Sequence, residues 1–116
     1  MPKLPFIDYS VSASLFGPFV LLNDQSSPLT IFTIDSTAVQ SCVLYYSIIR
    51  GSTVETGRIF IASNMSDLSF EVDKTNDVDT GILLTGAMSG TTIQIQYISN
   101  NTGQTATFKY SQQNLN

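Results

Sequence analysis

The stretch TTIQIQYISNNTGQTATFKY, residues 91–110, alternates apolar and polar side chains on both sides of a run of turn-forming residues. Successive side chains of an extended strand point to opposite faces, so Ile93, Ile95 and Tyr97 share one face. After the SNNTGQ turn, Phe108 returns to the apolar side. The stretch therefore predicts a β-hairpin with one dry face.

The polar row of this stretch contains Gln94 and Gln96, which carry no charge. An edge built in this way lacks the lysines that usually discourage strand-to-strand association. Water is one partner for this row, and a second protein surface is the other. We therefore count both glutamines among the candidate interface residues and leave water as the alternative.

The same two-residue period recurs along most of the chain, between short runs rich in Gly, Asn, Asp and Pro. The expected strands span residues 6–11, 19–22, 29–35, 39–49, 57–63, 68–73, 81–88, 92–98 and 105–111. This spacing predicts an all-β fold, a two-sheet antiparallel sandwich that is jelly-roll-like or a related Greek key, with a closed barrel as the alternative. We expect one domain over residues 1–116, with residues 1–18 as an extended arm and the tail SQQNLN frayed or used in an assembly contact.

The run CVLYYSII, residues 42–49, is apolar on both faces of the expected strand. A lone sandwich covers only one face, so Val43, Tyr45 and Ile49 need a second cover. A loop, the amino-terminal segment or another subunit would supply it, and we expect a homo-oligomer. The candidate interface residues are Leu4, Phe6, Val43, Tyr45, Ile49, Gln94 and Gln96.

The composition excludes several classes of partner. Charged residues make up 12% of the chain, and five Lys and Arg against nine Asp and Glu give a net charge of −4. No basic patch is available for a run of phosphates, so we expect neither nucleic-acid nor membrane binding. The amino terminus resembles neither a signal peptide nor an anchor. The single cysteine, Cys42, lies in an apolar run and is expected to be a buried, inert thiol.

Residues for catalysis are scarce. The chain has no histidine, and its three lysines form no recognisable pair with a nucleophile. We therefore expect no enzyme and no cofactor. A glycosidase needs only two carboxylates, so hydrolysis through Glu55 or Glu71 is the alternative.

Two polar groups and one aromatic group have alternative interpretations. The loop DKTNDVDTG, residues 73–81, offers oxygen ligands for calcium, but a solvated turn is the favoured interpretation. Arg50 is expected to pair with Glu55 across a turn, with a neighbouring subunit's carboxylate as the alternative partner. Four tyrosines are expected to serve in packing rather than as a sugar-binding platform: Tyr45, Tyr46, Tyr97 and Tyr110.

Four short motifs resemble a β-domain found in virion structural proteins of tailed bacteriophages, often at the carboxyl end of fibre-like chains. The pattern has a strand Y-S-I-x-R-G, then T-G-x-L-x-I-A, then T-G-I/V, and then T-G-x-x-A-T-x-K-Y. These motifs correspond here to 46–51, 56–62, 80–82 and 102–110. Residues 1–45 have no counterpart in the pattern.

The resemblance implies a passive assembly role in a virion that is put together in the cytoplasm of a bacterial host. A chain of this size resembles a capsid cement, or decoration, protein. The expected partners are other copies of the chain, as a trimer, together with the major capsid protein or other virion proteins. A fibre or tail-associated module that binds a receptor or glycan is the alternative.

Overall fold

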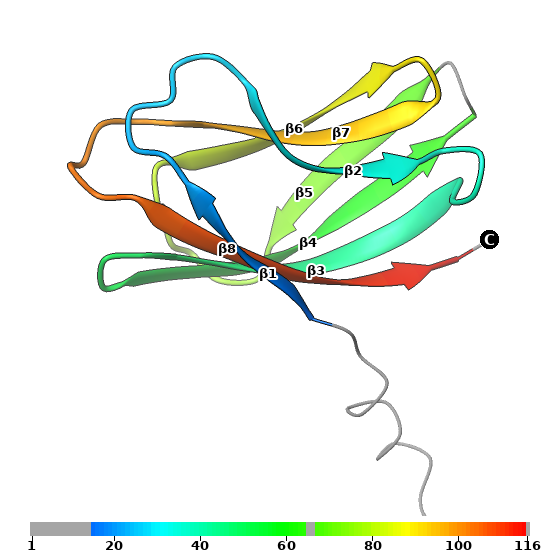
Figure 1. Cartoon of the computed structure of the whole chain (residues 1–116). Coiled ribbons are helices and arrows are strands. Elements are labelled where there is room, and N and C mark those ends of the chain that lie inside the picture. The colour runs from blue at the N-terminus through cyan, green and yellow to red at the C-terminus, as the bar shows by residue number, and fades with distance from the viewer. Residues whose placement is uncertain (1–14, 65–66, 116) are drawn as a thin grey trace, which may run out of the picture.

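The computed structural model describes residues 15–64 and 67–115, which form a sandwich of two antiparallel sheets (Figure 1). The strands are β1 (Phe16–Leu21), β2 (Leu29–Asp35), β3 (Ser41–Arg50), β4 (Thr53–Ser63), β5 (Leu68–Lys74), β6 (Ile82–Ser89), β7 (Thr92–Ser99) and β8 (Ala106–Asn114). One sheet has the order β1-β8-β3-β4-β5 and the other the order β2-β7-β6. The predicted all-β antiparallel sandwich is confirmed.

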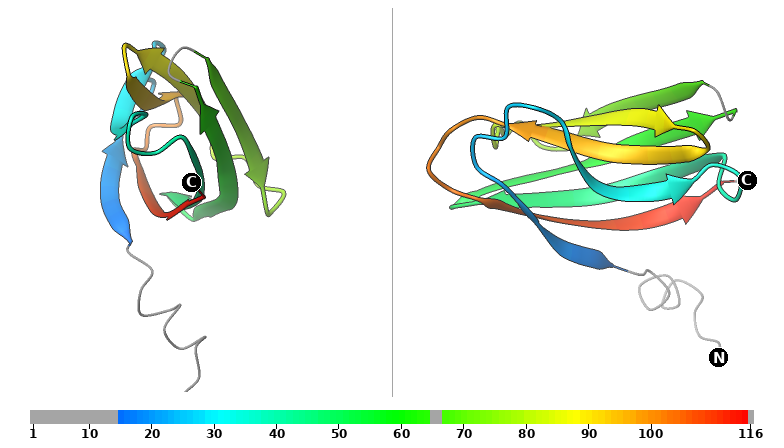
Figure 2. Two further views of the ribbon diagram at one scale, coloured as in Figure 1. Left: turned by 90° about the vertical axis from the view of Figure 1, so that its right-hand side faces the viewer. Right: turned by 45° about the horizontal axis from the view of Figure 1, so that its top comes forward.

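The topology places early and late strands side by side. β1 pairs with β8 in the five-stranded sheet, and β2 pairs with β7 in the three-stranded sheet. This nesting is the jelly-roll-like feature of the fold, while β4 and β5 stay beside β3 as a meander. Figure 2 shows the two layers from the end and from above.

The strand predictions agree with the structure in most places. The expected strand 29–35 has the observed bounds, and most others differ by one to three residues at an end. The strand expected at 6–11 lies outside the described residues, as does the arm up to residue 14, whereas Phe16 to Pro18 belong to β1.

Two segments predicted to be irregular are strands instead. β4 begins at Thr53, so the expected turn RGSTVETG shrinks to Gly51 and Ser52. Gly51 has φ +63°, a conformation that a tight hairpin needs and that glycine adopts without strain. At the other end of the chain, residues 111–114 of the expected frayed tail pair with β3.

The predicted hairpin over residues 91–110 is wrong. β7 pairs with β2 and β6, while β8 pairs with β1 and β3 in the opposite sheet. The apolar rows of the two strands do face the same core, but from opposite sides of it. The SNNTGQ segment is therefore a crossover between sheets rather than a hairpin turn.

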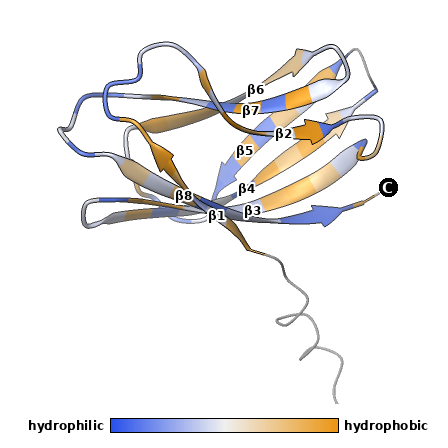
Figure 3. Cartoon of the chain, viewed as in Figure 1, coloured by the Kyte–Doolittle hydropathy of each residue, from blue (hydrophilic) through white to orange (hydrophobic). Residues whose placement is uncertain are grey.

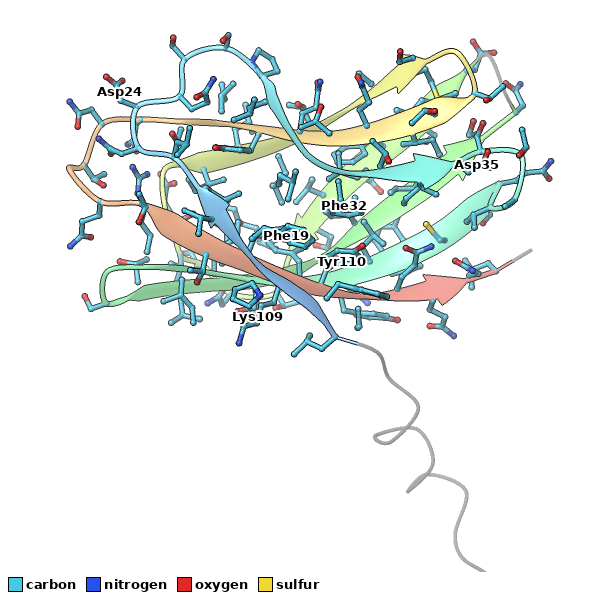
Figure 4. All side chains as sticks on the ribbon, in the orientation of Figure 1. Phe19, Asp24, Phe32, Asp35, Lys109 and Tyr110 are labelled. Carbon is cyan, nitrogen blue, oxygen red and sulfur yellow. The ribbon has the colours of Figure 1, made fainter. Side chains whose placement is uncertain are left out.

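The core lies between the sheets and is built from aliphatic residues and a stack of aromatic rings. Phe32 of β2 lies against Tyr110 of β8 with ring centroids 4.0 Å apart, and Phe19 of β1 lies 6.0 Å from Phe32 (Figure 4). These rings close the side of the sandwich at β1 and β2. Hydropathy colouring shows apolar segments along the strands of both sheets (Figure 3).

The opposite side of the sandwich is closed by a close contact between β5 and β6. Gly86 of β6 lies under the ring of Phe70 of β5, and a Cβ at this position would meet Phe70 Cδ2 at 2.5 Å. The missing side chain thus lets the ring fill the space between the two sheets.

We expect Gly86→Ala to destabilise the protein by about 1–3 kcal/mol, because the added methyl group overpacks this contact. Urea denaturation measures the change, and Phe70→Leu in the same background should restore part of the loss. Ser89→Ala, at an exposed position of the same strand, is the control and should change stability by less than about 0.5 kcal/mol. Equal effects of the two single substitutions would contradict this account.

Candidate interaction surface

The five-stranded sheet has a second face that the three-stranded sheet does not cover, and we call it the outer face. On β3, Leu44 and Ile48 point into the core and are fully buried, whereas Tyr45 and Ile49 point outward with 44% and 43% of their surface exposed. Val43 shares this outward row but is only 7% exposed. Of the three residues predicted to need a cover, two remain open.

The register places the outward side chains in rows that run across β8, β3, β4 and β5. The rows are Thr107, Ile49 and Val54; Lys109, Ser47 and Thr56; Ser111, Tyr45, Arg58 and Asp73; and Gln113, Val43, Phe60 and Glu71. Val54 and Phe60 of β4 are exposed by 43% and 36%. On β3 and β4 the outer face therefore has an apolar pair of residues in the first and last of these rows, and hydroxyl, aromatic and charged groups between them.

A shallow depression of about 420 Å³ lies at one corner of the outer face. Val43, Phe60, Glu71 and Leu115 contribute to its lining. The backbone N–H of Leu115 donates to the carbonyl oxygen of Ser41, which brings the end of the chain to the rim of the depression. Phe60 and Leu115 thus explain part of the burial of Val43.

At the sides of the outer face, Lys109 lies on β8, and the carboxylates of Asp73 and Glu71 lie on β5. Arg58 donates to Asp73 Oδ2 at 2.7 Å, and its guanidinium carbon lies 5.5 Å from the centroid of the Phe60 ring. Lys109 on β8 and Glu71 on β5 form no salt bridge with any other residue that the structure describes. Figure 4 shows Lys109 on the side of the sheet away from the core.

Further exposed apolar side chains lie at the two ends of β1 and at the start of β2, and we call this set of residues the β1–β2 edge. It is formed by Leu15, Phe16, Leu22 and Leu29, which are 41% to 66% exposed. Val20, at 63% exposed, joins this edge to the outer face because it pairs in register with Thr107. The described part of the chain thus presents exposed apolar side chains both on the outer face and at the β1–β2 edge.

The outer side of the three-stranded sheet carries polar side chains beside the exposed Leu83, and its glutamines hydrogen bond to their neighbours. Gln96 Nε2 donates to Thr30 Oγ1 and Gln94 Oε1, each at 3.4 Å, and both glutamines are half-buried. The structure therefore places Gln94 and Gln96 on a different sheet from Tyr45 and Ile49. Leu4 and Phe6 lie outside the described residues.

A buried polar network closes the end of the sandwich near Gly51, and sequence reasoning missed most of it. Arg50 is 4% exposed and donates to the carbonyl oxygens of Thr80, Asn100 and Gln104 and to the side-chain oxygens of Asn23 and Asn100, all at 2.7–3.0 Å. All five guanidinium donors are therefore satisfied, by three loops that connect the two sheets.

The expected pairing of Arg50 with Glu55 is wrong. Glu55, 1% exposed, accepts from the hydroxyls of Tyr46 at 2.8 Å and Thr80 at 2.7 Å, and its ion-pair partner is Lys74 at 3.7 Å. Thr80 links the two charged groups, because its carbonyl accepts from Arg50 while its hydroxyl donates to Glu55. Burial first, and then Glu55, raises the pKa of Tyr46 well above its ordinary value.

Arg50→Met should destabilise the protein by about 3–5 kcal/mol, because it leaves buried carbonyls and amides without their donor. Arg58→Met removes the other arginine of the chain, whose side chain is 43% exposed, and should change stability by less than about 1 kcal/mol. Thermal or urea unfolding monitored by circular dichroism compares the two variants. Similar losses in both would show that the Arg50 network is not a structural support.

The groups considered for chemistry have structural roles or lie apart. In the acidic loop, Asp73 pairs with Arg58 and Asp79 accepts from the N–H of Gly81 at 2.8 Å. Over residues 15–64 and 67–115, no three metal-ligating side chains lie close enough together to hold a metal ion. Glu55 is buried in its network and Glu71 is exposed on the outer face, so the structure does not bring the two carboxylates together.

The four tyrosines of the predicted aromatic group also lie apart from one another, in the core or on the outer face. Tyr46, Tyr97 and Tyr110 are 1% to 7% exposed and pack in the core, while Tyr45 alone of the four lies on the outer face. Tyr97 also offers no platform to solvent, since its hydroxyl accepts from the backbone N–H of Leu22 at 2.7 Å.

Cys42 is 1% exposed, and burial raises the pKa of its thiol to about 11. At mildly alkaline pH we expect a thiol reagent to label Cys42 very slowly in the native protein, because the reagent cannot reach the sulfur and little thiolate is present. In denaturant the labelling should be fast. Between the ordinary pKa of a thiol and about 11, the thiol of Cys42 ionises only in the unfolded chain. The free energy of unfolding should therefore fall as the pH rises through this range. Labelling at the same rate with and without denaturant would contradict the buried position.

No family model, curated protein or solved structure matches the chain. In the part of the chain that the structure describes, no helix is long and apolar enough to span a bilayer.

Proposed function

We propose that this chain is a bacteriophage virion structural protein, a capsid cement protein that stabilises the particle by burying surface between capsid subunits. The observation that carries the proposal is the exposure of large apolar side chains on the outer face and at the β1–β2 edge. The resemblance of four short motifs to virion proteins of tailed bacteriophages suggests where such an association would take place.

Two apolar surfaces suit a bridging protein because a bridge must hold at least two neighbours. Apolar burial contributes about 25 cal/mol per Å2 to association. A contact between subunits that buries several hundred Å2 therefore contributes several kcal/mol, before the entropy lost on binding is subtracted. This free energy holds the subunits together against the outward pressure of packaged DNA. Repetition of the contact over a capsid adds these contributions. The partners in this proposal are other copies of the chain and the major capsid protein on the outside of the particle.

One observation supports the alternative of a glycan-binding fibre module: Phe60 lines a depression on the outer face. A sugar would stack on an aromatic ring there. The Arg58 guanidinium, however, lies over the Phe60 ring and occupies one of its faces. We therefore prefer the cement protein.

The test uses particles of the source phage that lack this chain, to which the purified protein is added back. We expect it to bind the particles and to raise the temperature at which they release DNA. Leu22→Asp, which places a charge on the β1–β2 edge, should weaken this effect at least about tenfold in the protein concentration required. Leu83→Asp, at an exposed leucine on the other sheet, is the matched control.

Particles that neither bind the added protein nor gain heat stability would overturn the proposal. Equal loss in the Leu22 and Leu83 variants would place the capsid contact elsewhere than the β1–β2 edge.

A further inference from the structure

We propose that the outer face pairs with the outer face of a second copy of this chain, about a two-fold axis that runs parallel to the strands between β3 and β4. The inference rests on the proposed association role, and it names both the surface and its occupant. A two-fold contact requires that one surface be complementary to itself.

The rows of the outer face meet this requirement. Three of the four rows have chemically matched residues on β3 and β4: Ile49 with Val54, Ser47 with Thr56, and Val43 with Phe60. Rotation about the stated axis lays each β3 residue over its β4 row partner in the other copy. Apolar groups therefore meet apolar groups, and hydroxyls meet hydroxyls.

The fourth row is complementary in a different way. It pairs Tyr45 with Arg58, so the two-fold places the ring of one copy against the guanidinium of the other. A guanidinium over an aromatic face is a favourable contact. Tyr45 is exposed enough to accept it, at 44%.

The charges at the two sides of the face agree with the same axis. Lys109 lies on β8, one strand outside the central pair, and Asp73 and Glu71 lie on β5, one strand outside it on the other side. The rotation brings β8 of one copy over β5 of the other, so Lys109 lies one row away from Asp73 of the other copy. Two sheets aligned in this way pack about 10 Å apart, as in a sandwich core.

This pairing closes at two copies, because the contact uses one face of each. It thus differs from the trimer that the motif resemblance implies. It leaves the β1–β2 edges of both copies at the sides of the pair, where they remain open to a capsid subunit.

Sedimentation equilibrium on the purified chain, without phage particles, tests the pairing. We expect a reversible dimer. Ile49→Lys and Val54→Asp should each weaken dimerisation at least about tenfold, because each places an unpaired charge against an apolar residue of the other copy. An equimolar mixture of the two variants should recover dimers, since the introduced ammonium group of one copy then lies over the introduced carboxylate of the other. Leu83→Lys, on the outer side of the three-stranded sheet, should leave dimerisation unchanged.

A wild-type chain that stays monomeric, a trimer insensitive to Ile49→Lys, or a mixture no more dimeric than its components would each overturn the pairing. A monomer that still stabilises phage particles would overturn the pairing alone and leave the proposed function standing. A dimer that binds no particle would overturn the proposed function and leave the pairing standing.

Discussion

The architecture depends on one constraint: one sheet has five strands and the sheet that packs on it has only three. A strand has two faces, and the central strand β3 is apolar on both. The three-stranded sheet covers only the inner face of the five-stranded sheet, where Leu44 and Ile48 are fully buried. The outer face leaves Tyr45 and Ile49 exposed. A molecule built in this way has apolar surface to offer to a neighbour.

Two buried charged groups, Arg50 and Glu55, support this arrangement. Arg50 uses all of its donors to tie three loops together, and Glu55 is held by Tyr46 and Thr80 inside the sandwich end. Such a network fixes the separation and relative position of the two sheets. A rigid frame is what a surface needs if it is to associate without losing much conformational freedom.

The sequence predicted what depends on local period and failed where distant segments meet. Alternation located most strands, and CVLYYSII correctly indicated a strand with two apolar faces. The same alternation does not say which sheet a strand joins, and for this reason β7 and β8 were expected to form a hairpin. Arg50 was assigned to Glu55 because both flank one turn, whereas its acceptors come from Asn23, Thr80, Asn100 and Gln104, far apart along the chain.

The rows of the outer face were also beyond the sequence, because they exist only once the register of β8, β3, β4 and β5 is set. The candidate residues Gln94 and Gln96 illustrate the converse case. Their alternation was read correctly, but the sheet on which they lie places them away from Tyr45 and Ile49.

The most direct test of the central claim is hydroxyl-radical footprinting of the outer face in dilute and concentrated protein, read out by mass spectrometry. If this face is completed by a neighbour, oxidation of Tyr45 and Phe60 should fall as the protein is concentrated, while oxidation of Leu83 on the other sheet stays constant. Oxidation of Tyr45 and Phe60 that is independent of concentration, both in the free protein and on phage particles, would contradict the account.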